Sequence, residues 1–480
     1  MLLTTERDIE SGSDRDTVAV VGGGCAGILV AAHLLRLDRR PRHIVIFEPR
    51  DQLGAGAAYS TDDRRHLLNA PAAGMSAFED DPAHFVTWLA ARNLGFGPAD
   101  FVPRHRYREY LQDVLDDEVR RAAPATEVTW MHQMVTSVQI GGGFKRPATT
   151  VRFGHGKQCR VDAVVLALGA PAPVALSSLD VSPSFGMIRD PWCPGALDAT
   201  VTTGDVLVLG TGLTMVDVAM VLTDRDPRRT VHARSRHGLL PAEHASDGFA
   251  PWPGFEMGEP TTAREVLCRL RRMTVEAEST GWNWRNVIAA ARSAAPAVWG
   301  GLSETERRRL LRHLARRWEV SRHRMSTPVA TAVTDLRRSG RLTVGAGRVL
   351  SVDNEGSVGD PRLRVTLAGP CGRRETLTVS TLIDCTGPGP DPTVGSPLIA
   401  GLVERGLART HPSGIGLDVD EHGDLRTGTG APGTIHSVGW CRRGAEFEAT
   451  AVPEIRRQAN LLARHIAEVT GARHPVLVHA

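Results

Sequence analysis

The sequence is poor in cysteine, and its seven cysteines include no C-x-x-C pair. A zinc ribbon or a thioredoxin-like redox motif requires that spacing, so neither class is expected. A flavin disulfide reductase would also need a close cysteine pair after its first nucleotide-binding helix, and the sequence has none there. We therefore expect reduced, mostly buried thiols and no metal site.

Long apolar runs and an excess of one charge are also missing. No run approaches the roughly 18 consecutive apolar residues of a membrane helix, and 57 basic side chains nearly balance 54 acidic ones. These values give no reason to expect a membrane or nucleic-acid partner. Residues 1–16 are polar and acidic, without the basic region and apolar core of a signal peptide. We expect them to be a disordered leader of a cytoplasmic protein.

What the sequence does contain is a glycine fingerprint between two apolar runs, within residues 17–48. The run 18–21 predicts a buried strand, a helix pattern follows the glycines, and a second strand ends at Glu48. Gly22, Gly24 and Gly27 have the G-x-G-x-x-G spacing, which forms a tight turn and lets a pyrophosphate approach the backbone. Glu48 stands where a carboxylate accepts hydrogen bonds from a ribose. The alternative, a glycine-rich turn in an ordinary α/β domain, leaves Glu48 unexplained.

A second strand, glycine turn and helix follow in residues 205–219. Gly210 and Gly212 keep the first two positions, but Met215 replaces the third glycine. The next strand ends in Arg234-Ser235-Arg236-His237 rather than in an acid. Because arginine pairs with a 2′-phosphate, this ending favours NADPH over NADH. The alternative is that the two arginines are solvated loop charges.

The segments between and after these units are less regular. Residues 54–76 form a long loop, which suits a segment lying against a flat ring. Residues 261–329 are helical and basic, with tryptophans on an apolar face and arginines that cover a lid near phosphates or solvent. The cluster 321–325 is a candidate wall of a substrate or nicotinamide pocket, without metal-ligand spacing around His323. Buried strands ending at Gly169 and Gly387 mark passages between domains.

The nearer resemblance is carried by GAGAAYSTDDRRHLLNAPAAGMSAF, RHRYREYLQDVL, SRHGLLP, RHRMSTP and EATAVPEIRRQA. Together these segments resemble FAD/NAD(P)-binding proteins of bacterial biosynthetic clusters, which are relatives of the class B flavin monooxygenases. That group is similar to the lysine and ornithine N-hydroxylases and to the nitrosuccinate-forming aspartate N-oxygenases. The resemblance covers residues 17–467.

The resemblance implies an α/β fold with two Rossmann-like dinucleotide-binding domains and a helical insertion, residues 258–330, in the second. Residues 17–170 and 375–470 would form the FAD domain, and residues 171–374 the NADPH domain. The FAD contacts would be Gly22, Gly24, Cys25, Ala26, Gly27, Glu48, Arg50, Gly56, Tyr59, His66, Asn69, Met75, Ser76, Val135, Gly169, Gly387 and Val452. The NADPH contacts would be Gly210, Gly212, Leu213, Thr214, Arg234 and Arg236.

The implied activity is that of an FAD- and NADPH-dependent monooxygenase that oxygenates a nitrogen of a small amine or amino acid through a C4a-(hydro)peroxyflavin. The partners would be that substrate and O₂, and a homo-oligomer is left open. Candidates for the pocket wall are His66, Asn69, Arg324 and Glu448, with no side-chain catalyst assigned. A flavin reductase that passes electrons to a partner protein, or a non-enzymatic flavin-binding regulator, would need much of the same sequence.

Overall fold

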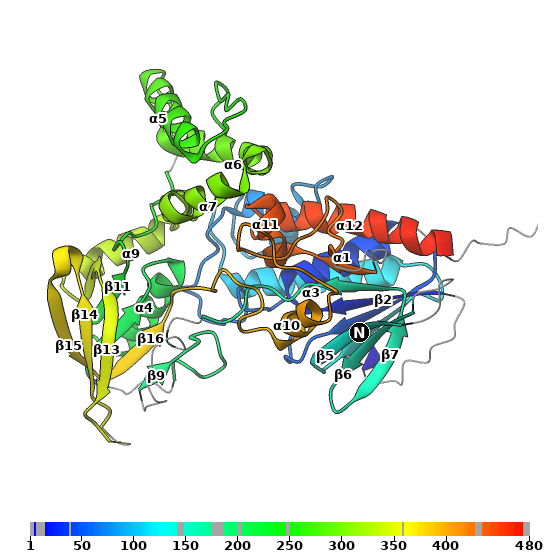
Figure 1. Cartoon of the computed structure of the whole chain (residues 1–480), viewed down its shortest axis with the longest axis horizontal. Coiled ribbons are helices and arrows are strands. Elements are labelled where there is room, and N and C mark those ends of the chain that lie inside the picture. The colour runs from blue at the N-terminus through cyan, green and yellow to red at the C-terminus, as the bar shows by residue number, and fades with distance from the viewer. Residues whose placement is uncertain are drawn as a thin grey trace, which may run out of the picture.

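Two parallel sheets, each covered on both faces, make up the core of the protein (Figure 1). The computed structural model describes residues 4–5, 15–37, 40–141, 148–173, 176, 186–198, 203–245, 250–357, 360–427 and 434–473. Of the expected leader, Thr4–Thr5 form a short strand, β1, and residues 15–16 precede or begin the next one; the rest lies outside the described residues. No described helix is both long and apolar enough to span a bilayer.

The first sheet has the strand order β1-β4-β3-β2-β8-β17, and its neighbouring strands are parallel. β3 is buried along its whole length and β2 at every position except Thr17, as expected for parallel strands covered on both faces. The strands are β2 (Asp16–Val21), β3 (Arg42–Phe47), β4 (Glu127–Met131), β8 (Ala163–Leu166) and β17 (Ile435–Ser437). Helices α1 (Cys25–Leu37), α3 (Arg104–Arg121) and α12 (Val452–Arg473) pack on one face.

An antiparallel sheet covers the opposite face of the first sheet. It consists of β5 (Val135–Gly141), β6 (Ala148–Phe153) and β7 (Lys157–Val161), with α10 (Pro397–Glu404) beside it. The short helix α2 (His84–Ala91) lies near α3, and its Trp88 donates a hydrogen bond to Asp113.

The second sheet has the same layered construction. Its order is β12-β11-β10-β16-β9, again with parallel neighbours. The strands are β9 (Met187–Ile188), β10 (Val206–Leu209), β11 (Val231–Ser235), β12 (Leu342–Ala346) and β16 (Thr381–Asp384). Helices α4 (Leu213–Arg225) and α9 (Thr327–Arg338) cover one face. The antiparallel strands β13 (Arg348–Asn354), β14 (Leu363–Ala368) and β15 (Arg374–Val379) cover the other.

The placement of β15 and β16 corrects the expected return to the first domain at residue 375. β16 is hydrogen-bonded to β10, and β15 completes the small sheet on the second domain. The chain re-enters the first domain only afterwards, with α10 packed against β5. A strand ending in glycine does not reveal its sheet, because pairing between distant strands decides that assignment.

The expected helical insertion is present as four helices that stand beside the junction of the two domains (Figure 1). They are α5 (Ala263–Ser279), α6 (Trp284–Gly301), α7 (Glu304–His313) and α8 (Ala315–Arg322). Ser303 caps α7 by accepting a hydrogen bond from the Glu306 backbone N–H. Trp299 of α6 is buried, and its Nε1 donates to the carbonyl of Gly444 at 2.7 Å, which ties the insertion to the short helix α11 (Arg443–Glu446).

Candidate functional site

The first glycine loop joins β2 to α1 with no room for side chains. Gly22 has a φ of +108°, and a Cβ there would lie 2.3 Å from the carbonyl oxygen of Ala167. A Cβ on Gly27 would lie 1.9 Å from the carbonyl oxygen of Gly22. Gly24 and Gly56 face one another, since each Cα is the nearest atom to the Cβ that the other lacks. The loop therefore holds α1 close to the sheet. The backbone N–H groups at the start of α1 are then available to a phosphate.

Glu48 is held at the end of β3 by backbone donors. Its Oε2 accepts from the N–H of Gly23 and its Oε1 from the N–H of Arg50, both at 3.0 Å. The residue is buried but lines the cavity described below. Each carboxylate oxygen has a further lone pair, so this arrangement can accept hydrogen bonds from a ribose diol.

The second glycine loop repeats this turn between β10 and α4. The N–H of Gly210 donates to the carbonyl of Arg234 at 2.7 Å, and Gly210 has a φ of +102°. Met215, at the position of the third glycine, is fully buried in the core that α4 and α9 form on the sheet. The first two glycines therefore shape the loop, while the third position supplies core volume.

Both glycine loops open into one cavity of about 1530 Å³. Most of the predicted cofactor residues line it: Gly22, Gly24, Cys25, Ala26, Glu48, Arg50, Gly56, Tyr59, Gly169 and Gly387 on the first side, and Gly210, Gly212, Leu213, Thr214, Arg234 and Arg236 on the second. Of the four candidates for the pocket wall, Glu448 lines the cavity. Two glycine loops, each at a helix N-terminus, fit the phosphates of two dinucleotides.

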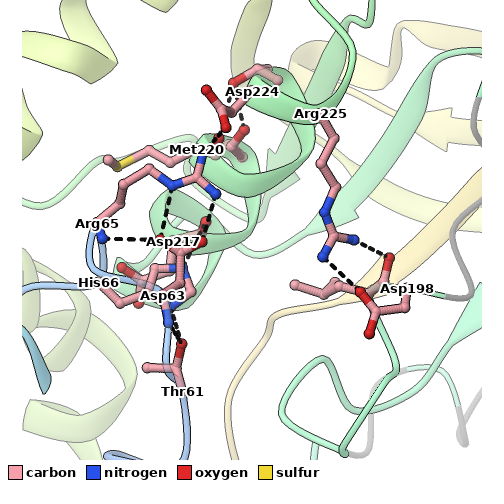
Figure 2. Close-up of polar contacts among 12 residues, drawn as sticks. Thr61, Asp63, Arg65, His66, Asp198, Asp217, Met220, Asp224 and Arg225 are labelled. Carbon is pink, nitrogen blue, oxygen red and sulfur yellow. Dashed lines mark hydrogen bonds and ion pairs between the residues drawn. The ribbon is translucent and has the colours of Figure 1, made fainter. Parts of the chain in front are cut away.

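The remaining predicted residues do not line this cavity, and His66 shows why. Figure 2 shows Asp63, Arg65 and His66 lying beside Asp217, Met220 and Asp224 of α4. The Nδ1 of His66 is 2.7 Å from Thr61 Oγ1, and its Nε2 is 3.3 Å from the carbonyl of Asp217. Arg104 pairs with the Asp217 carboxylate at 2.7 Å. His66 is thus part of a contact between the two domains.

Asn69 has a similar position, because its carbonyl accepts a hydrogen bond from His244 Nε2 at 2.9 Å. Ser76 is buried, and its hydroxyl donates to the carbonyl of Asp81 at 2.6 Å. The other predicted residues that lie away from the cavity belong to the hydrophobic core of the first domain. Met75 and Val452 pack with α1, and Val135 lies on β5. Only residues 55–59 of the expected ring-contacting loop reach the cavity.

Arg234 lies on the cavity wall, but its guanidinium is already paired. Its Nη2 and Nε donate to the two carboxylate oxygens of Glu375 at 2.7 and 3.2 Å. Its Nη1 faces the carbonyls of Ala233 and Thr343. Arg236, two residues further, is exposed at the cavity edge. The pattern of the sequence could not reveal the Glu375 pairing.

A third wall of the cavity comes from α8 and from the loop after α11. Trp318, His323, Phe447 and Glu448 line it. Trp318 Nε1 donates to Glu448 Oε1 at 2.5 Å, and Arg322 Nε is 3.4 Å from Glu448 Oε2. Of these residues, the sequence patterns predicted Glu448 and the cluster around His323 as parts of a pocket. They placed Trp318 only on the apolar face of a helix, and Phe447 only in a loop.

The backbone at Phe447 is strained. Its φ is +61° and its ψ −58°, and the N–H of Glu448 donates to the carbonyl of Glu446 at 2.7 Å. These values describe a γ-turn that L residues rarely adopt, at a cost of roughly 1–3 kcal/mol. The Phe447 ring is stacked on Trp299, with ring centroids 5.0 Å apart. The fold thus maintains a costly turn next to Glu448.

Burial shapes the charges around this wall. Burial, followed by the charges of Arg322 and Arg443, lowers the pKa of His323 to about 3, so its imidazole is neutral. Burial, followed by the charges of Arg322 and Arg285, lowers the pKa of Arg324 to about 10. Arg324 itself does not line the cavity, and its Nε and Nη1 are buried without a hydrogen-bond partner among the described residues. Burial raises the pKa of the Cys25 thiol to about 12, so it is not a thiolate.

Among the described residues, one group has a geometry that could hold a metal ion: Asp424, His436 and His465. The Asp424 carboxylate bridges the two rings, at 2.5 Å from His436 Nδ1 and 3.1 Å from His465 Nε2. These residues do not line the cavity. Hydrogen bonding accounts for the arrangement, which links β17 to α12.

Comparisons with known proteins agree with this geometry. Residues 19–171 match the family model described as FAD-NAD(P)-binding. Among curated proteins, YdhS of Escherichia coli (strain K12) is 26% identical over 49% of this chain and 48% of that protein. The monooxygenase ptmN of Penicillium ochrochloron is 24% identical over 46% of this chain and 35% of that protein. The chain therefore spans about half or less of the length of these relatives.

Solved structures match over nearly the whole chain. The ornithine N-hydroxylase KtzI of Kutzneria sp. 744, with reduced FAD, NADP⁺ and L-ornithine, has a TM-score of 0.62 and 16% identity, covering 95% of this chain and 99% of that one. L-lysine 6-monooxygenase of Pseudomonas syringae gives a TM-score of 0.62 at 17% identity, with coverages of 95% and 99%. The predicted fold class is confirmed, and the expected cofactor class is confirmed by the family model. Residues 19–171 are an FAD-NAD(P)-binding domain, and the chain has the two-dinucleotide fold of the ornithine and lysine hydroxylases.

Proposed function

We propose that this protein is an FAD- and NADPH-dependent monooxygenase that oxygenates a nitrogen of a small amino-acid substrate. One observation carries the proposal: both glycine loops share a cavity with a third wall, formed by Trp318, His323 and Glu448, that has no nucleotide-binding pattern. A reductase that passes electrons to a partner protein has no need of such a wall. The relatives named as monooxygenases and hydroxylases support the same choice.

Bound FAD would supply the electron transfer and the activation of O₂. The chain's own residues would bind, orient and shield the substrate. Glu448, held by Trp318 and Arg322, can accept hydrogen bonds from a substrate amine. The neutral His323 adds no positive charge that would repel an ammonium group. Trp318 and Phe447 line this end of the cavity and would shield a bound substrate from water.

A cationic side chain near Glu448 favours an amino acid over a simple amine. Arg443 lines the cavity together with His323 and Glu448, and its charge adds to burial and to the charge of Arg322 in lowering the pKa of His323. A carboxylate matches the fork of donors of a guanidinium. We therefore expect the substrate to carry a carboxylate.

The test is a coupled assay on the FAD-loaded protein. NADPH oxidation, O₂ uptake and H₂O₂ release are followed with L-ornithine, L-lysine, L-aspartate and the carboxylate-free diamine cadaverine. We expect one amino acid to raise NADPH oxidation and suppress H₂O₂ release, with a product heavier by one oxygen atom in mass spectrometry. If no panel member suppresses H₂O₂ release, while a dye accepts electrons rapidly from the NADPH-reduced protein, the reductase interpretation is favoured.

Glu448→Gln keeps the size of the side chain and removes its charge. We expect it to abolish most of the substrate-dependent coupling while NADPH still reduces the flavin. Glu454→Gln is the matched control, because Glu454 pairs with Arg292 and does not line the cavity. Equal coupling in both variants would contradict the role of Glu448.

A further inference from the structure

The two arginines expected to bind the 2′-phosphate are not equally available. Arg234 makes a two-point contact with Glu375, and its side chain is 10% exposed. Its third nitrogen faces two backbone carbonyls and the Thr343 hydroxyl. Each of the three nitrogens already has a hydrogen-bond partner, so a two-point contact with a phosphate would have to displace the Glu375 carboxylate. Of the predicted pair, Arg236 at the cavity edge stays available, so a second cation on the glycine loop would have to come from elsewhere in the chain.

The helical insertion places such a cation on the loop. Arg316 of α8 points its Nη2 at Thr211 Oγ1 (3.3 Å) and at the carbonyl of Leu239 (3.0 Å). Thr211 stands between Gly210 and Gly212 in the fingerprint. Arg316 Nη1 is the nearest atom to the position that a Cβ on Gly212 would occupy, at 4.0 Å. Its side chain is 25% exposed and lines the cavity.

The present partners of Arg316 are weak competitors for a phosphate. Two are neutral oxygens, and the one acid is Glu319, at 3.5 Å with 40% of its side chain exposed. A phosphate presents charged oxygens that match the guanidinium fork, and hydrogen bonds to a charged acceptor are roughly twice as strong as neutral ones. Arg308 and Arg312, at four-residue steps before Arg316, line the same cavity and add positive charge.

We propose that Arg316, supplied by the helical insertion, binds a phosphate group of the nicotinamide dinucleotide on the second glycine loop. This inference rests on the proposed use of NADPH. It gives the insertion a role in cofactor binding beyond covering the substrate: α8 contacts the dinucleotide loop through Arg316 and the substrate wall through Trp318, two residues later.

Binding measurements test the proposal independently of turnover. NADP⁺, NAD⁺ and 2′,5′-ADP are titrated into the oxidised, FAD-loaded protein by calorimetry. Arg316→Met keeps the apolar stem and removes the donors. We expect it to weaken NADP⁺ binding by about 10- to 100-fold, the loss typical of a hydrogen bond to a charged group. Arg316→Lys should restore part of the affinity, because it keeps the charge without the fork.

Arg317→Met is the matched control, since Arg317 is the next residue of α8, is exposed and does not line the cavity. Weaker binding of NADP⁺ and 2′,5′-ADP with unchanged NAD⁺ binding would assign Arg316 to the 2′-phosphate. Equal weakening of NADP⁺ and NAD⁺ would assign it to the pyrophosphate. Equal affinities in the folded Arg316→Met and Arg317→Met variants, checked by thermal unfolding, would overturn the proposal. Failure of the unaltered protein to bind any of the three probes would instead count against the proposed function.

Discussion

The two glycine units of this protein have the same order of strand, turn, helix and strand, yet they end differently. The first ends in Glu48, which backbone N–H groups orient toward the cavity. The second ends in Arg234 and Ser235, and Glu375 of the covering sheet pairs with Arg234. The N–H of Gly22 donates to the carbonyl of Phe47, and that of Gly210 donates to the carbonyl of Arg234. Ser235 therefore corresponds to Glu48 at the position that the fold assigns to ribose recognition, and Arg234 precedes it by one residue. The comparison teaches that the register of the strand end and the neighbouring side chains together decide which residue is available.

The largest expected effect comes from the third motif position, where the two units make opposite demands. Gly27→Ala would place a Cβ 1.9 Å from the Gly22 carbonyl oxygen, so we expect loss of bound FAD and a free energy of unfolding lower by about 3 kcal/mol. Denaturant unfolding and the protein's flavin absorbance measure both. Gly74→Ala is the control, because a Cβ there meets nothing within 4 Å. In the second unit, Met215→Ala should instead lower stability through a cavity, by about 2–5 kcal/mol. Retention of FAD in Gly27→Ala would break the comparison.

An intermediate effect is expected at acid pH, where one carboxylate within the first domain and one at its contact with α4 each have a pKa near 2. Burial alone would raise the pKa of Asp424, but its hydrogen bonds with His436 and His465 outweigh it and hold the pKa at about 2. The hydrogen bond from Arg65 holds the pKa of Asp63 at about 2. Both values lie below the ordinary 3.8, so the stabilisation is present above about pH 4 and is lost as the pH falls toward 2.

Acid unfolding of single variants separates the two contributions. Asp424→Asn should remove about 2 kcal/mol of stability at neutral pH and flatten the decline between pH 4 and pH 2. Asp63→Asn should do the same to a smaller extent, because the Arg65 side chain is 33% exposed and solvent screens the pair. An unchanged acid profile in Asp424→Asn would show that the bridge between β17 and α12 does not contribute.

The smallest expected effects compare the terminal residues of the two units directly. Glu48→Gln should weaken FAD binding about tenfold, because an amide NH₂ group would face a backbone N–H donor. Arg234→Met should lower stability by about 1 kcal/mol and leave the ratio of NADP⁺ to NAD⁺ affinities unchanged. Titration calorimetry measures the affinities, with Glu375→Gln as the control for the ion pair. A lost preference for NADP⁺ in Arg234→Met alone would restore the phosphate role to Arg234.

The site was predictable where the determinants are close in sequence. Gly22, Gly24 and Glu48 lie within 27 residues and share one turn, one helix start and one strand end, so their spacing carries the geometry. His66 and Asn69 were not predictable in this way. His66 meets Asp217, which is 151 residues away, and the carbonyl of Asn69 meets His244, which is 175 residues away. These contacts turn the loop toward α4 and away from the cavity.

By itself, the sequence determined the two glycine turns, the helical insertion and the nature of the first nucleotide domain, because backbone sterics and hydrophobic periodicity act over a few residues. Only the tertiary structure decided which sheet β16 joins, that Arg234 pairs with Glu375, and that Arg316 lies on the second glycine loop. Each of these depends on groups more than 100 residues apart, such as the 105 residues between Thr211 and Arg316. Packing of the completed domains brings such groups together, and no local pattern encodes it.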